Sequence, residues 1–271
     1  MENKKILITG SNGFIGSHLI KALNEQGFDP IAFDIKMGEE FDIFHPNLEK
    51  QIQEVDAVIH LAALTSVEDS FKDAGEVFRI NVLGTARIIE FCNKYKKKLI
   101  FPSSAAIYHA ELSPYAESKL VAETLVRGMN KAFPVVVFRF FNIFGPDMNK
   151  DTGSIMYNFL TSKEILVFGD GEQTRDYIHV RDVVSIIIDA LNNKDYDGKT
   201  IDVGTGDSYT TNYIAGLFAY CRGIKVKYKI PRKEIKWSKA NTQLLKTLYK
   251  DPLTTNLEKD IKELINYYHE N

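Results

Sequence analysis

Short apolar runs alternate with amphipathic helical stretches along the first two-thirds of the chain. Apolar runs that predict buried strands occur at residues 6–8, 30–33, 56–61, 99–102 and 135–140. Long helices are predicted at residues 78–95 and 115–129, where apolar residues recur at helical spacing. Uninterrupted apolar runs are typical of parallel strands that are covered on both faces. The pattern therefore predicts an α/β fold, a doubly wound parallel sheet with right-handed crossovers.

The alternation ends after Asn142, where Gly145, Pro146 and Gly153 indicate loops and the stretch FGDGEQTRD is rich in turn formers. A helix at 180–191 and a strand at 200–203 could rejoin the sheet. The last helix carries an apolar stripe, made of Leu257, Ile261, Leu264, Ile265 and Tyr268. We expect two interleaved domains: residues 1–143 with about 176–205, and a smaller lobe of about 144–175 with 206–271.

Three glycines follow the first predicted strand at intervals of three residues: Gly10, Gly13 and Gly16. A strand, a glycine turn and a helix together direct backbone N–H groups and the positive helix end toward a pyrophosphate. Glycine is required where the chain turns tightly and where backbone must approach a ligand closely. We therefore expect this segment to bind a dinucleotide.

Asp34 ends the second predicted strand, eighteen residues after Gly16. A carboxylate at this place can accept hydrogen bonds from the ribose hydroxyls of adenosine and would repel a 2′-phosphate. We therefore predict NAD as the cofactor in preference to NADP. Lys36 could soften this preference, although a solvated lysine is the simpler interpretation.

Composition narrows the class of partner. The net charge is -2, with 34 basic and 36 acidic residues interspersed, which gives no electrostatic reason to expect nucleic acid or a membrane surface as partner. No apolar run has the length of a membrane span, and residues 1–10 lead directly into a strand without a signal-peptide pattern. Cys92 and Cys221 suggest buried free thiols in a reducing compartment. We expect a cytoplasmic protein.

Tyr115 and Lys119 form a YxxxK pair at the start of the second long helix, and residues four apart share a helix face. An ammonium near a phenol favours the phenolate, so we expect the pKa of Tyr115 to lie below its ordinary value. Ser104 ends a predicted strand and should therefore emerge at the same sheet edge as the glycine turn. Serine, tyrosine and lysine together can bind a hydroxyl or carbonyl oxygen and transfer its proton.

Nine motifs occur in the order found in one enzyme family: TGSNGFIGSHL, the terminal Asp34, DAVIHLAA, NVLGT, PSSAAIY, YAESK, RFFNIFGP, GDGEQTRDYIHVRDV and DVGTG. Over about residues 4–206 the chain resembles the extended short-chain dehydrogenase/reductases, specifically the NAD-dependent nucleotide-sugar epimerases and dehydratases. The resemblance implies a Rossmann domain with a smaller C-terminal substrate lobe. It also implies a homodimer joined through the two long helices, at about 78–96 and 115–129.

The resemblance implies a role for each matching position. Tyr115 becomes the acid/base, Lys119 binds the nicotinamide ribose and tunes the tyrosine, and Ser104 orients the sugar hydroxyl. The residues that would contact the cofactor are Gly10, Gly13, Phe14, Ile15 and Gly16 at the pyrophosphate, Asp34 at the ribose, Asp42 and Ile43 at the adenine, Leu61, Ala62 and Ala63 beside it, and Asn81 supporting the nearby loop. The residues that would hold the substrate diphosphate are Asn142, Arg175 and Arg232. An ion pair with Asp176 is the alternative for Arg175.

The segment after Ser104 bears on the reaction. Sugar 4,6-dehydratases of this family carry an Asp–Glu pair there, whereas Ala105 and Ala106 cannot transfer a proton. The resemblance thus favours epimerisation of a nucleoside-diphosphate sugar at C4 through a 4-keto intermediate. Two alternatives stay open: a 4-keto-sugar reductase on the same scaffold, and a non-catalytic nucleotide-binding protein, which would be expected to lose Tyr115 or Lys119.

Two histidines lie in the matching motifs, and two segments depart from the family pattern. His60 and His179 lie within family motifs, but their spacing suggests neither a metal site nor a nucleophile relay, so we interpret both as structural and predict no metal. The loop between Tyr108 and Tyr115 is shorter than in many relatives, and the tail after Gly206 is compressed. These departures leave the identity of the nucleobase and the sugar open.

Overall fold

Two units share the chain, and each is built from two separate segments. The computed structural model describes residues 3–148, 154–231 and 234–270. One unit comprises Met1–Arg139 and Val184–Ile201, and the other comprises Phe140–Val183 and Asp202–Asn271. We expected the second segment of the first unit to begin at about residue 176. In the structure this segment begins at Val184, because β8 (Thr174–His179) pairs within the sheet of the second unit.

The predicted parallel sheet is confirmed, and it has six strands in the order β2-β1-β3-β4-β5-β9. The bounds of its strands are β1 Lys5–Thr9, β2 Asp29–Phe33, β3 Ala57–His60, β4 Lys98–Ser104, β5 Val135–Phe140 and β9 Thr200–Val203. Ile6, Leu7 and Ile8 are at most 1% exposed, as expected for a strand covered on both faces.

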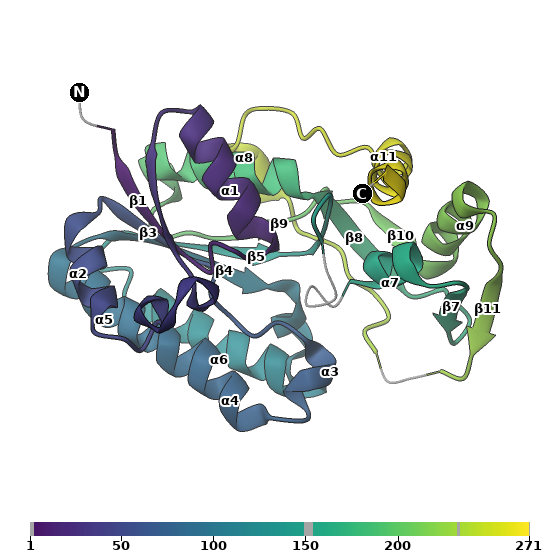
Figure 1. The fold of residues 1–271 in the computed structure, drawn as a ribbon, viewed down its shortest axis with the longest axis horizontal. Coiled ribbons are helices and arrows are strands. Elements are labelled where there is room, and N and C mark those ends of the chain that lie inside the picture. Colours follow the sequence, from purple (N-terminus) through teal and green to yellow (C-terminus); the bar gives the residue numbers. More distant parts are fainter. Residues whose placement is uncertain (1–2, 149–153, 232–233, 271) are drawn as a thin grey trace. The chain divides into compact units, whose positions relative to one another are not determined.

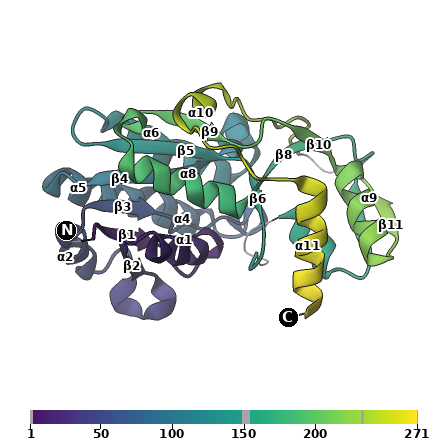
Figure 2. The same ribbon diagram turned by 90° about the horizontal axis from the view of Figure 1, so that it is seen from above.

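Helices cover both faces of this sheet (Figures 1 and 2), with α1 and α8 on one face and α4, α5 and α6 on the other. Their bounds are α1 Phe14–Glu25, α2 Asn47–Glu54, α3 Val67–Ser70, α4 Ala74–Phe78, α5 Thr85–Tyr95, α6 Pro114–Gly128 and α8 Val180–Asn192. Within the helix expected at 78–95, Arg79–Gly84 is a π-helical segment that continues directly from α4 into α5. Such segments are frequent at functional sites.

Strand order and register bring the predicted cofactor residues together. The chain moves outward from β1 to β2 and then returns to β3 on the other side of β1, so the order reverses beside β1. Thr9 is in register with Phe33 on one side and with His60 on the other. The next residues, Gly10, Asp34 and Leu61, therefore leave the sheet side by side at a topological switch point, where ligands of such sheets bind.

The described residues of the second unit form two small sheets. One has the order β10-β8-β6, and the other pairs β11 with β7. The bounds of its elements are β6 Asn142–Phe144, α7 Ile155–Thr161, β7 Ile165–Phe168, β10 Ser208–Thr210, α9 Thr211–Arg222, β11 Val226–Lys229, α10 Gln243–Leu248 and α11 Leu257–Glu270. The predicted stripe on the last helix is largely buried, whereas Cys221, which we expected to be buried, is partly exposed. Within the described residues, no helix combines the length and apolarity needed to cross a membrane.

Candidate active site

The glycine turn is held by close backbone contacts. Gly10 has a φ of +72°, and a Cβ at this position would lie 2.6 Å from the backbone nitrogen of Ala62. A Cβ on Gly16 would lie 2.3 Å from the carbonyl oxygen of Gly10. Both positions require glycine, because a fixed backbone atom occupies the space that a side chain would need. The turn is therefore built to bring β1, β3 and α1 together.

Two further observations fit this turn to a dinucleotide phosphate. The residue before α1 is Gly13, which has no side chain that could accept a hydrogen bond from the start of the helix. The first backbone N–H groups of α1, those of Phe14, Ile15 and Gly16, therefore have no side-chain cap. Among the described residues, the buried Ser11 Oγ has no hydrogen-bond partner. Uncapped N–H groups at a positive helix end, beside an unpaired buried hydroxyl, suit a phosphate group.

Asp34 is placed to connect the turn with the second strand. Its Oδ2 accepts the N–H of Asn12 at 2.9 Å, and its Oδ1 accepts the N–H of Lys36 at 2.9 Å. Asp34 is only 7% exposed. Each oxygen retains acceptor capacity for a ribose hydroxyl, because a carboxylate can accept about four hydrogen bonds.

The residues predicted at the adenine differ in their surroundings. Asp42 accepts the N–H of Phe44 at 2.7 Å and lines a pocket of about 480 Å³ together with Ile35. Ile43 is instead buried in the core, where its Cδ1 occupies the space beside Gly84. Ile35, which is 54% exposed next to Asp34, is an apolar side chain that the sequence patterns did not single out.

Ser104, Tyr115 and Lys119 lie together in the first unit. Ser104 is the last residue of β4, and its Oγ accepts the N–H of Ala106 at 3.1 Å. Ser113 caps α6 by accepting the N–H of Ala116, and Pro114 follows at the first helical position, so the helix begins just before Tyr115. The side chains of Ser104 and Tyr115 form a hydrogen bond with each other.

We expected the ammonium of Lys119 to lower the pKa of Tyr115, but the surroundings of the phenol shift its pKa in the other direction. Desolvation raises the pKa of Tyr115 above its ordinary value, and the hydrogen bond with Ser104 only opposes this. Lys119 donates instead to the carbonyl of Pro102, at 2.6 Å. Burial of Tyr115 therefore disfavours the phenolate, and the hydrogen bond with Ser104 favours it.

Lys119 is only 6% exposed, and its ammonium lies 4.5 Å from the centre of the Phe101 ring. Burial lowers its pKa to about 8, while the charge of Glu123 opposes the shift. Glu123 is fully buried and accepts hydrogen bonds from Ser103 at 2.7 Å and from Arg139 at 2.6 Å. The carboxylate is thus committed to partners within the fold.

The substrate residues that the sequence suggested lie in the second unit, apart from Arg232, which is outside the described residues. Asn142 donates through Nδ2 to the carbonyl of Asp176 at 2.9 Å. Arg175 pairs with Glu234 at 3.3 Å and not with Asp176.

Asp176 is buried and accepts the backbone N–H groups of Thr205, Gly206 and Ala240. Glu234 had not been singled out, because it is 59 residues from Arg175 in the chain.

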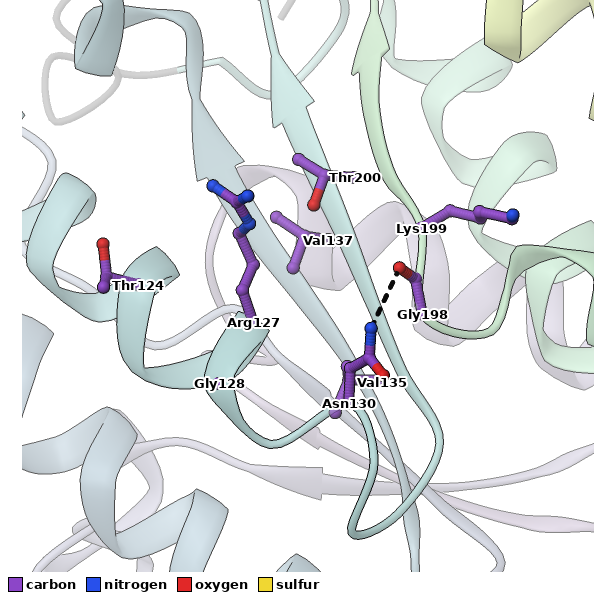
Figure 3. Close-up of a pocket in the computed structure, with 9 residues that line it drawn as sticks. All are labelled: Thr124, Arg127, Gly128, Asn130, Val135, Val137, Gly198, Lys199 and Thr200. Carbon is purple, nitrogen blue, oxygen red and sulfur yellow. Dashed lines mark hydrogen bonds between the residues drawn. The ribbon is translucent and has the colours of Figure 1, made fainter.

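A second pocket in the first unit, of about 450 Å³, lies toward the other end of the sheet (Figure 3). It is lined by the first residues of β5 and β9 and by the last turn of α6. Arg127 extends toward Val137 and Thr200, whereas Lys199 points away from them. Because ligands of parallel sheets bind at the carboxyl ends of the strands, this pocket is not the predicted site.

Comparison with known proteins gives a consistent family. Residues 6–204 match the family profile described as NAD dependent epimerase/dehydratase family. A UDP-N-acetyl-alpha-D-glucosaminuronate decarboxylase of Bacillus cytotoxicus is 30% identical over 78% of each chain. A UDP-glucose 4-epimerase of Yersinia enterocolitica is 27% identical over 83% of this chain and 84% of the relative.

The fold also matches solved structures. The UDP-glucuronic acid 4-epimerase of Bacillus cereus, in complex with UDP-glucuronic acid and NAD, superimposes with a TM-score of 0.88 at 26% identity. The match covers 98% of this chain and 99% of that one.

Replacing Gly10 by alanine should destabilise the protein more than the same change at Gly27. Both glycines have positive φ, so each substitution should cost roughly 1–2 kcal/mol in backbone strain. Gly27 has nothing within 4 Å of an added Cβ, whereas at Gly10 the backbone of Ala62 is in the way. We expect Gly10→Ala to cost a further ~1–3 kcal/mol in denaturant unfolding. Equal losses for the two variants would show that the close contact is not under constraint.

The buried ammonium of Lys119 predicts a pH dependence of stability. The ordinary lysine pKa of 10.5 applies to the unfolded chain, and the pKa of Lys119 falls to about 8 in the folded protein. Between these values the unfolded chain holds a proton that the folded protein has released, so stability rises with pH. Relative to Lys119→Met, the free energy of unfolding should increase by on the order of 3 kcal/mol across this range, measured by urea unfolding. If the difference in free energy of unfolding between the wild-type protein and Lys119→Met stays constant with pH, burial does not lower the pKa of Lys119.

Proposed function

Because this chain belongs to the NAD-dependent epimerase/dehydratase family, we propose that it epimerises a nucleoside-diphosphate sugar at C4. The observation that carries the proposal is the cluster of Ser104, Tyr115 and Lys119, together with the two alanines, at positions 105 and 106, that directly follow Ser104 in the sequence. A dehydratase needs a further acid/base next to the sugar. The buried carboxylate nearest to Lys119 in the helix, Glu123, is committed to Ser103 and Arg139.

The residues of the site have complementary tasks. The glycine turn and Asp34 would hold NAD, which would supply the redox chemistry of the reaction, a reversible exchange of hydride. Tyr115 takes the hydroxyl proton as the carbonyl forms and gives it back afterwards. Ser104 donates a hydrogen bond to the same oxygen. The positive charge of Lys119 favours the phenolate that starts the reaction. No net oxidation results, so atoms and electrons balance within the sugar.

The second unit supplies the residues proposed for the substrate. We assign Asn142 and Arg175 to the diphosphate, since an arginine fork matches phosphate oxygens. Arg175 is oriented by Glu234 and by the carbonyl of Thr174, to which it donates at 2.8 Å. Arg232 is proposed as a second phosphate ligand on its sequence position alone. Two free cysteines, with Cys92 buried, suit a reducing compartment, and we propose the cytoplasm.

A substrate panel tests the function. The protein is incubated with NAD and with UDP-, GDP-, dTDP- and CDP-sugars, and the products are identified by NMR. We expect a C4 epimer from at least one of them. Tyr115→Phe should lower kcat by about 10²–10⁴-fold while NAD remains bound. Tyr220→Phe, a change at an exposed tyrosine, serves as control and should keep full activity. A deoxy-keto product, or net consumption of NADH, would reject epimerisation.

We also propose a homodimer formed through the helices at about 78–96 and 115–129. The support is that Leu83 and Leu125, one on each helical segment, are 57% and 40% exposed. Replacing both by glutamate should convert the dimer to a monomer in light scattering after gel filtration, because charges are unfavourable at an apolar interface. Leu244→Glu is the matched surface control on α10. A wild-type monomer would contradict this assembly.

A further inference from the structure

His60 is the last residue of β3, and both of its ring nitrogens have partners. Nδ1 lies 2.7 Å from Thr9 Oγ1, and Nε2 lies 3.2 Å from Thr85 Oγ1. Thr9 ends β1 next to the glycine turn, and Thr85 begins α5. The imidazole is 2% exposed, so it connects two elements of the site without contact with bulk water.

The number of hydrogens on each group determines the direction of every hydrogen bond in this series, which links Thr9, His60 and Thr85. Thr85 Oγ1 donates its single hydrogen to the carbonyl of Asn81, at 2.6 Å. It must therefore accept from His60, which requires Nε2 to carry the proton. Nδ1 is then the acceptor for Thr9 Oγ1, which in turn accepts the N–H of Ala62 at 3.3 Å. Each hydrogen bond in the series thus donates in the same direction, from the N–H of Ala62 to the carbonyl of Asn81.

The surroundings of His60 keep the ring neutral. Burial, together with the positive charge of Lys119, lowers its pKa to about 3. The ring centre lies 6.2 Å from that of Phe101, and the ammonium of Lys119 lies 4.5 Å from the centre of the same Phe101 ring. A protonated ring would also leave Thr9 Oγ1 facing a donor in place of an acceptor. One tautomer thus satisfies all partners.

The series of hydrogen bonds ends at Asn81, whose side chain contacts Leu64 and Ser118. The side chain of Asn81 accepts the N–H of Leu64 and donates to its carbonyl, at 2.8 and 2.9 Å. It also donates to Ser118 Oγ at 2.9 Å, and Ser118 donates to the carbonyl of Tyr115 at 2.7 Å. Thr85 bonds back to the residue four earlier, a contact that bends helices, and Asn81 lies in the π-helical segment.

We propose that His60 is a positioning residue that, as a neutral imidazole protonated on Nε2, holds Asn81 and through it the Leu64 loop and the first turn of α6. This assignment goes beyond the structural interpretation of the sequence, and its kinetic readout rests on the proposed epimerase function. His60 does not act on the sugar itself. It sets the place of Tyr115 relative to the strand end that carries the glycine turn.

Matched threonine variants test the link. Thr85→Val removes the hydroxyl at constant shape, and Thr85→Ser keeps it. Because a misplaced catalytic group reacts slowly even when substrate binds, Thr85→Val should lower kcat by about tenfold or more with KM for the sugar within about twofold. Thr85→Ser should stay within about threefold of wild type. The control is Thr211→Val, which removes another buried hydroxyl that donates to a carbonyl. If Thr85→Val keeps wild-type kcat, or if Thr85→Ser is as slow as Thr85→Val, the proposal is overturned.

A second measurement is independent of catalysis. In ¹⁵N NMR spectra of the wild-type protein, His60 should show a protonated Nε2 and an unprotonated Nδ1, with no titration between about pH 5 and pH 9. A ring protonated on Nδ1, or one that titrates in this range, would overturn the proposal. If no sugar is epimerised but the tautomer is as expected, the proposed function has failed and the hydrogen-bond chain still stands.

Discussion

The ammonium of Lys119 is held out of water, and the side chains around it are arranged to make this tolerable. It donates to the carbonyl of Pro102 and faces the Phe101 ring, while the buried Glu123 favours its charged form. The same charge helps to keep His60 neutral. A buried cation costs stability in itself, but in a desolvated site it acts strongly on any phenolate that forms nearby. The cost in stability and the catalytic use therefore have one origin.

The first unit brings together three chain segments that follow β1, β2 and β3 at one edge of its sheet. Gly10 touches the backbone of Ala62, and Asp34 accepts the N–H of Asn12. The backbone of the glycine turn is thereby defined before any ligand arrives. A preorganised cradle of this kind spends little binding free energy on ordering itself, which favours tight retention of a cofactor. Retention suits a reaction that returns its hydride in every turnover.

The second unit uses buried carboxylates to organise irregular chain. Asp176 gathers the backbone N–H groups of Thr205, Gly206 and Ala240, and Asp182 accepts those of Thr254 and Thr255. These N–H groups belong to loop residues, which lie outside the described helices and strands. Side chains that accept several backbone N–H groups satisfy these donors in place of helix or strand hydrogen bonds. Arg175, held by Glu234, is positioned by the same kind of contact.

Local patterns in the sequence determined the parallel sheet, the glycine turn and the Tyr115–Lys119 pair, because strand burial, tight turns and helix spacing depend on neighbouring residues. Only the tertiary structure decided the rest. His60 meets Thr9 across 51 positions and Thr85 across 25, and Arg175 finds Glu234 rather than the adjacent Asp176. The pKa of Tyr115 moved opposite to expectation because desolvation, which no spacing reveals, outweighs its hydrogen bond. Long-range pairing and burial are properties of the packed chain, and they set the charge states on which the chemistry depends.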